Sequence, residues 1–323
     1  MSLTDERVRP STNGSAPEPG RSRWWPEVLY LAVFYVIYRL THDRGSVAVV
    51  QARPVTATGV AGAAVRPSAA ARGLRWWREV LYILVFYLVY SAIRNTQGSA
   101  AVSVAHAMGN ALDIIRLEEV LGLYHEQAIQ HAFLGNRLFI EFWNLFYGSF
   151  HFVVTTGALI LLFRRFPERY RPWRNTLAFT TALALIGFAA YPLMPPRLLP
   201  SSYGYVDTLK SYGSLWSFDS GAVNKISNQY AAMPSLHFAW ASWSALVLIP
   251  AVQSVWAKVL AGIYPFLTLF AIVVTANHFI LDAAGGLAVL LVGLAIGFPL
   301  AARIERRVAT RVGAAGAAGV AGA

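Results

Sequence analysis

Long apolar segments separated by short polar loops set the pattern of this chain. Segments of roughly 20 apolar residues are long enough to cross a bilayer, and in lipid a spanning helix satisfies its own backbone hydrogen bonds. The segments lie at about 75–90, 138–163, 175–193, 235–251, 258–276 and 279–301. The pattern therefore predicts an all-α fold, a polytopic membrane helix bundle with six core transmembrane helices.

A further apolar segment precedes these six and is a near copy of the first. RWWPEVLYLAVFYVIY (Arg23 to Tyr38) matches RWWREVLYILVFYLVY (Arg75 to Tyr90) at nearly every position. The second copy leads into the rest of the chain, so we take it as the first core helix. The first copy is an extra N-terminal hydrophobic segment. An additional span, an interfacial helix and an uncleaved signal-like segment would each explain it.

Residues 100–135 have a helical pattern but are too polar to span. Their polar side chains are Asp113, Arg116, Glu118, Glu119, Glu126 and Gln130. This mixture is typical of amphipathic helices that lie on a membrane surface. Together with the flanking composition, it gives five expected regions: a disordered N-terminus (1–22), the duplicated hydrophobic segment (23–40), a flexible linker (41–74), the membrane domain (75–303) and a low-complexity cytoplasmic tail (304–323).

Composition supports a membrane protein and excludes some chemistry. The chain is 56% hydrophobic and 13% charged, whereas soluble domains carry about 25% charged residues. It has no cysteine, which excludes disulfides and thiolate metal sites. The formal charge of +11 comes from basic residues that flank apolar segments. Because they do not form one face, they do not indicate a nucleic-acid partner.

Arginine placement predicts the orientation of the bundle. The short loop from Arg164 to Arg174 carries five arginines, and Arg303, Arg306 and Arg307 follow the last apolar segment. Arginine-rich short loops are cytoplasmic, so the segments 100–137 and 194–233 are expected outside. This corresponds to the plasma membrane of a bacterium, with amphipathic helices on the outer face.

The same alternation brings two histidines and an aspartate to the outer side. His237 begins the 235–251 segment, and His278 and Asp282 begin the 279–301 segment. Asp282 is one helical turn from His278, so its carboxylate can accept from one ring nitrogen and leave the other to attack phosphorus. His237 can then protonate a leaving oxygen. A structural role for each histidine and a metal site formed by all three groups are the alternatives.

Groups that would bind a phosphate lie nearby in the sequence. Arg197 offers a planar fork of donors, although it would also serve as an interfacial anchor. Ser235 adds a hydroxyl at a helix start, where it would also act as a cap. Lys225 and Asn228 are further candidates in the outer loop.

Three more residues are possible substrate contacts. Tyr147 and His151 share a helix face with Asn144, and an interhelical hydrogen bond is the alternative role for this face. Asn277 precedes the proposed nucleophile.

The segments PPRLLP, AAMPSLH and NHFILDAAGG resemble the membrane-bound type-2 phosphatidic acid phosphatase superfamily. Within it, they are most similar to the branch that contains inositol-phosphorylceramide synthases. The resemblance covers about residues 75–303. It implies a six-helix core, no metal or other cofactor, His278 as nucleophile, Asp282 as its partner and His237 as acid and base.

The chain departs from the phosphatase pattern of that superfamily at three places. The motif Lys-x6-Arg-Pro is absent, Ile272 stands where an arginine usually precedes the nucleophile, and Leu236 stands where many phosphatases have glycine. These departures favour the synthase-like branch.

The sequence thus predicts an integral-membrane lipid phosphatase or phosphotransferase that works through a phosphohistidine. Its substrate would be a phospholipid or a polyprenyl or other lipid phosphate at the outer face. Phosphoinositol-type headgroup transfer onto a lipid hydroxyl is an alternative. A non-catalytic lipid-binding or lipid-transport protein is an alternative of another class.

Overall fold

The computed structural model describes residues 74–96, 102–212 and 229–321. The predicted N-terminus (1–22), the duplicated segment (23–40) and nearly all of the predicted linker (41–74) lie outside these residues, as do Lys225 and Asn228. The described residues therefore cover most of the predicted membrane domain and nearly all of the tail.

The described chain is helical, with strand-like pairing limited to one isolated bridge between Leu193 and Ala231. Its bundle consists of α2 (Trp76–Thr96), α5 (Arg137–Arg165), α6 (Pro167–Ala190), α9 (Leu236–Leu248), α10 (Val255–Val274) and α11 (Ile280–Ala321). The other elements are α3 (Val104–Leu121), α4 (Glu126–Phe133), η1 (Pro196–Leu198), η2 (Ser201–Tyr203) and α7 (Thr208–Tyr212). The bounds of α5, α9 and α10 agree with the apolar segments to within three residues. Helix α2 ends six residues later than its segment, and α6 begins eight residues earlier, so most of the predicted loop from Arg164 to Arg174 is helical. The last helix continues through the low-complexity tail.

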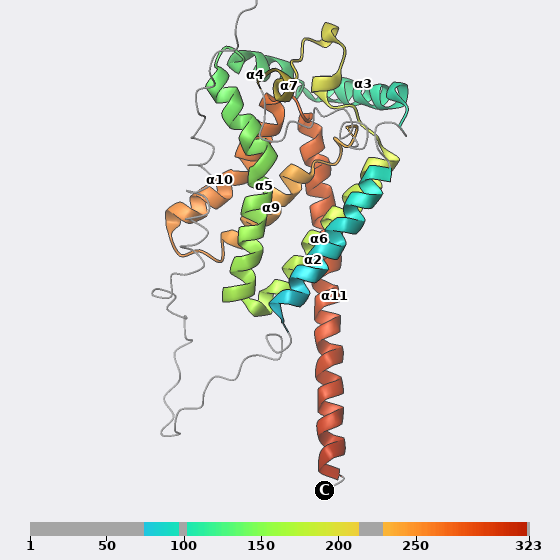
Figure 1. The fold of residues 1–323 in the computed structure, drawn as a ribbon, viewed down its shortest axis with the longest axis vertical. Coiled ribbons are helices and arrows are strands. Elements are labelled where there is room, and N and C mark those ends of the chain that lie inside the picture. Colours follow the sequence, from blue (N-terminus) through green and yellow to red (C-terminus); the bar gives the residue numbers. More distant parts are fainter. Residues whose placement is uncertain (1–73, 97–101, 213–228, 322–323) are drawn as a thin grey trace, which may run out of the picture.

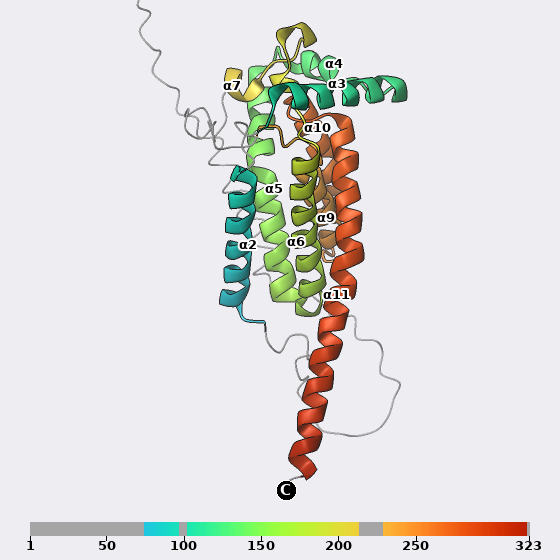
Figure 2. The same ribbon diagram turned by 90° about the vertical axis from the view of Figure 1, so that its right-hand side faces the viewer.

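The bundle helices run alongside one another, and α3 lies across one end of them (Figure 1). Figure 2 shows α4 and α7 at this same end and the start of α2 towards the opposite end. We call the end covered by α3, α4 and α7 the covered end, and the end at which α2 begins the open end.

Within residues 74–96, 102–212 and 229–321, four helical stretches are long and apolar enough to cross a membrane. They are Trp76–Ile93 in α2, Arg137–Arg165 in α5, Val255–Val274 in α10 and Ile280–Arg307 in α11. The apolar helix α9 is shorter. Large apolar side chains such as Leu84, Phe266 and Leu291 are exposed on these helices, as a lipid-facing surface requires. The all-α polytopic bundle is confirmed, and the number of six core spans stays a prediction.

Glycine allows the closest helix contacts in the bundle. A Cβ on Gly297 of α11 would lie 2.7 Å from the backbone nitrogen of Thr176 in α6. A Cβ on Gly286 would lie 2.3 Å from the backbone oxygen of Ser235, at the start of α9. Small residues let membrane helices approach this closely. The second contact sets the start of α9 against the first turns of α11, and this brings His237 towards His278.

The helix α3 orients its polar and apolar residues in an unexpected way. Its apolar residues Leu117, Val120 and Leu121 are exposed, whereas Glu118 is fully buried. Glu126 of α4 is fully buried as well. The amphipathic pattern predicts helices at this end, but the carboxylates point into the protein because they bind the start of α11.

Candidate active site

The turn between α10 and α11 presents His278. After Val274 the chain reverses through Ala276, whose φ of 52° lies in the left-handed region. The backbone nitrogens of Asn277 and His278 both donate to the Ile272 oxygen, at 2.9 and 3.2 Å. A non-glycine residue in this region costs about 1 kcal/mol or more, so the surrounding contacts must hold the turn in place. The side chain of Ile272 is itself fully buried.

His278 and Asp282 form the predicted contact. The Nδ1 atom of His278 lies 3.1 Å from Oδ2 of Asp282, which also accepts from the Phe279 backbone nitrogen at 3.0 Å. Both side chains are almost completely buried. Because a carboxylate accepts here, the imidazole carries its proton on Nδ1, and Nε2 is the nitrogen that keeps a lone pair.

His237 approaches this pair from α9. Its ring centroid lies 5.5 Å from that of His278, with the planes inclined at 64°. Ser235 caps the helix by accepting from the Phe238 nitrogen at 3.4 Å, and its own nitrogen donates to the Asp282 backbone oxygen at 2.9 Å. The second bond ties the start of α9 directly to the first turn of α11, so the two histidines share one frame.

Aromatic rings from α5 enclose the face of His237. Tyr147 stacks on it with centroids 4.3 Å apart, and the ring of His151 meets it edge-on at 4.3 Å. The Nδ1 atom of His151 donates to the Tyr147 backbone oxygen at 3.0 Å. The two predicted substrate contacts of α5 therefore lie together with the histidines.

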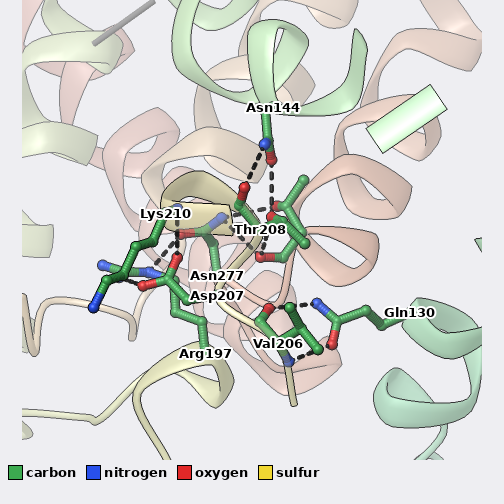
Figure 3. Close-up of polar contacts among 9 residues, drawn as sticks. Gln130, Asn144, Arg197, Val206, Asp207, Thr208, Lys210 and Asn277 are labelled. Atoms are coloured by element: carbon green, nitrogen blue, oxygen red, sulfur yellow. Dashed lines mark hydrogen bonds and ion pairs between the residues drawn. The ribbon is translucent and has the colours of Figure 1, made fainter. Parts of the chain in front are cut away.

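Arg197 lies beside the turn that carries His278. Its Nε donates to Oδ1 of Asn277 at 2.9 Å, and its Nη1 donates to Oδ2 of Asp207 at 3.1 Å (Figure 3). Its backbone nitrogen donates to the Ala276 oxygen at 2.8 Å. Asn277 is thus a partner of Arg197. Asp207, which the sequence did not single out, fixes the other side of the guanidinium.

A polar network holds the segment around Asp207 on the bundle. Asn144 of α5 exchanges two hydrogen bonds of 2.9 Å with Thr208, one to its backbone oxygen and one from its hydroxyl. Gln130 of α4 pairs with the backbone of Val206 through two further bonds of 2.9 Å, as Figure 3 shows. Asn144 therefore makes hydrogen bonds between helices, as the alternative role for its face predicts, and its partner Thr208 begins the short helix α7.

Three acidic side chains accept backbone hydrogen bonds at the start of α11. Asp282 accepts from Phe279, Glu126 accepts from Ile280 at 3.0 Å, and Glu118 accepts from Leu281 at 2.7 Å. A helix start leaves such donors unsatisfied, and it also favours negative charge.

Sequence reasoning missed this role of Glu118 and Glu126. The sequence does hold a signal for it. No serine, threonine or asparagine stands immediately before Ile280, so the buried start of this helix has no local cap. Such a start requires acceptors from elsewhere in the fold.

Glu118 is largely protonated at neutral pH. Burial, followed by the nearby carboxyl group of Glu126, raises the pKa of Glu118 to about 9. A protonated Glu118 avoids a second negative charge in one buried place. The pair thereby holds the start of α11 with less buried negative charge than two carboxylates would bring.

Predicted site residues on three stretches of the chain thus meet at the covered end: His237 with Ser235, His278 with Asp282 and Asn277, and Arg197. Tyr147 and His151 join them from α5. Within the described residues, no group of three or more histidine, aspartate or glutamate side chains is arranged to hold a metal ion.

No curated protein and no solved structure gives a significant match to the chain. A family model described as the PAP2 superfamily matches residues 112–296, more than half of the chain. The match includes the turn of His278, the start of α9, the Arg197 segment and both buried glutamates. The chain belongs to the PAP2 superfamily.

Proposed function

We propose that this protein is a membrane phosphatase or phosphotransferase that forms a phosphohistidine on His278. The observation that carries the proposal is the buried His278–Asp282 pair with a second histidine ring 5.5 Å away. Membership of the superfamily supports a phosphatase or phosphotransferase, and the apolar bundle supports a lipid-type substrate.

The first half-reaction uses both histidines. Nε2 of His278 attacks phosphorus, and the bond from phosphorus to the leaving oxygen breaks as His237 donates a proton to that oxygen. Asp282 keeps the proton of His278 on Nδ1 and stabilises the positive charge that develops on the ring. In the second half-reaction, His237 takes a proton from water or an acceptor hydroxyl, which attacks phosphorus and releases His278.

Arg197 is the proposed anchor for the phosphoryl oxygens. Asn277 and Asp207 hold its Nε and Nη1, which fixes the plane of the guanidinium beside His278. A guanidinium in a fixed orientation binds an oxyanion without losing further side-chain entropy. Ser235 contributes the helix start of α9, whose first backbone donors favour an anion.

The substrate is proposed to be a lipid-linked phosphate at the outer membrane face. The arginines at the end of α5, at the start of α6 and after Ala301 support a cytoplasmic open end by the positive-inside rule. The covered end with its histidines then faces outwards. A phospholipid or a polyprenyl phosphate would reach this end from the outer leaflet.

Headgroup transfer in the manner of inositol-phosphorylceramide synthases is the second candidate. It is favoured by Ile272, which fills with a buried apolar side chain the position from which many phosphatases offer an arginine. With one cation fewer near the phosphate, the enzyme would suit a phosphodiester, which carries less charge than a monoester. A lipid hydroxyl would then replace water as the acceptor.

The test is turnover by the purified full chain on a panel of lipid phosphates and phospholipids, with and without acceptor lipids and with EDTA present. We expect a phosphoenzyme that is labile in acid and stable in alkali, and His278→Ala should abolish it. His106→Ala, at an exposed histidine on α3, is the matched control and should retain it. Lipid binding without turnover or phosphoenzyme would establish the non-catalytic alternative instead.

A further inference from the structure

A pocket of about 260 Å³ lies towards the open end, between α2, α6 and α11. It is lined by Arg78, Glu79 and Tyr82 from α2 and by Arg171, Arg174 and Asn175 from α6, and Ala301 of α11 closes its third wall. Ala301 is 23 residues after His278, which corresponds to about 34 Å of helix. The pocket is therefore separate from the histidine site.

The pocket carries more positive than negative charge. Arg174 is committed to neighbours, since it forms an ion pair with Glu79 and donates to Oδ1 of Asn175 at 2.9 and 3.3 Å. Arg78 lies over the Trp77 ring at 5.1 Å. Among the described residues, neither Arg78 nor Arg171 has an ion pair. Three arginines face one glutamate, so the two unpaired guanidinium groups remain available to an anion.

The surroundings of the pocket match the headgroup layer of a membrane. Trp76 and Trp77 begin α2 and are 68% and 47% exposed, and tryptophan favours this layer. Leu81 and Leu84 on the same helix are exposed as well. An anionic group that enters here from the leaflet would contact arginines at one depth and apolar residues above it. Basic pockets between helices on this side of a membrane suit anionic headgroups.

The walls of the pocket extend beyond the part of the chain that matches the superfamily. The match covers residues 112–296, so Arg78, Glu79 and Tyr82 precede it and Ala301 follows it. The pocket exists because the ion pair between Glu79 and Arg174 fixes α2 against α6. A ligand held by Arg78 and Arg171 would bridge the same two helices.

The geometry points to a binding site for a phosphate group between α2 and α6, held by Arg78 and Arg171. The phosphate belongs to an anionic phospholipid of the leaflet at the open end, or to inorganic phosphate in solution. Arginine binds phosphate oxygens through its planar fork of donors. The negative charge of Glu79 is balanced by Arg174, so it repels a phosphate only weakly. The bound group joins α2 to the bundle at the end opposite to the histidines.

The test uses the full chain and counts bound phosphatidylglycerol by native mass spectrometry during a titration. Phosphatidylcholine, with no net charge, serves as the comparison lipid. We expect phosphatidylglycerol to bind more tightly than phosphatidylcholine, and the double variant Arg78→Ala with Arg171→Ala to weaken its binding about 30-fold, given the usual gain from two arginines near an anionic headgroup. The double variant Arg164→Ala with Arg306→Ala removes the same charge outside the pocket and should bind as the parent does.

Competition with inorganic phosphate distinguishes the two sources. Displacement of the lipid by phosphate at millimolar concentration identifies free phosphate as the ligand, and lack of displacement identifies the lipid. Equal binding of both lipids, or equal loss in both double variants, would overturn the site. If the double alanine variant does not fold, Arg171→Gln keeps the ion pair of Arg174 and is expected to lose about fivefold.

Discussion

The two ends of the bundle handle charge in opposite ways. At the covered end, Glu118, Glu126 and Asp282 are fully buried, and each binds a backbone donor at the start of α11. At the open end, Arg78 and Arg164 are exposed, and one buried carboxylate, Glu79, pairs with Arg174 between α2 and α6. Buried charge requires partners and costs several kcal/mol when one is removed, whereas exposed charge tolerates change. Single substitutions should therefore have large effects at the covered end and, apart from the Glu79–Arg174 pair, small effects at the open end.

The largest expected effect is that of Asp282→Asn. The amide keeps the size of the side chain but can hold the wrong tautomer of His278, so turnover should fall about 10³- to 10⁴-fold. The measurement is kcat on the substrate that the panel identifies. Asp113→Asn on α3, where the exposed carboxylate pairs with Arg116, should leave kcat within about twofold. Equal loss in both variants would contradict the contrast between buried and exposed carboxylates.

Gly286→Ala should separate the two histidines. Its Cβ would meet the backbone oxygen of Ser235 at 2.3 Å, so α9 must move away from α11. We expect a loss of about 1–3 kcal/mol in stability and a lower kcat. Thermal unfolding in detergent and turnover measure both.

The control is Gly262→Ala on α10, where an added Cβ meets nothing closer than 4.0 Å. Alanine favours helix over glycine there, so stability should stay equal or rise slightly. If Gly286→Ala is as stable as this control, α9 and α11 can move apart without loss of stability, which would contradict the prediction.

Glu118 predicts a pH dependence that belongs to the covered end. Its pKa is raised from 4.5 to about 9, so the folded state holds a proton that the unfolded state releases above pH 4.5. Its stabilising contribution is complete below that pH and falls as pH rises towards 9, by about 1.4 kcal/mol per pH unit. Unfolding measured between pH 6 and 9 should show the decline.

Glu118→Gln, which keeps a neutral side chain, should flatten that decline. Glu119→Gln, at the exposed neighbour, is the matched control and should preserve it. An unchanged slope in Glu118→Gln would show that another group titrates.

Deletion of residues 1–70 should have the smallest effect. The deleted chain includes the duplicated hydrophobic segment and joins the bundle at the start of α2, at the end opposite to the histidines. We expect a folded protein with parental turnover in detergent or vesicles. A truncated protein that inserts but is inactive would make the first copy part of the catalytic fold.

The helices and the central site residues could be predicted because their signals are local. Apolar length locates α5 and α10 to within a few residues, and the four-residue spacing of His278 and Asp282 fixes their contact on one helix turn. The orientation of α3 was not predictable in this way. Apolar side chains are usually buried and acidic ones exposed, but here Val120 is exposed and Glu118 is buried. Glu118 is buried because it accepts a hydrogen bond from Leu281 at the start of α11, 163 positions later in the chain.

The surroundings of Arg197 show the same limit. Its residue type indicates phosphate binding, but its orientation depends on Asp207 and Asn277, which approach it from a short connecting segment and from the turn before α11. Such contacts depend on the packing of loops, for which the sequence has no periodic signal. Only the folded chain identifies Asp207 as a partner.

The length of α11 has a consequence for local unfolding. This helix has 42 residues, about 63 Å, whereas the hydrocarbon core of a bilayer is about 30 Å thick. Its part after Arg307 contains several glycines, and each glycine inside a helix lowers helix stability by about 1 kcal/mol relative to alanine. Amide hydrogen exchange should therefore grade along one unbroken helix, from protection near that of global unfolding at Asp282 to exchange within seconds near Ala321. The free energy of local opening would then decrease along a single helix from its start to its end.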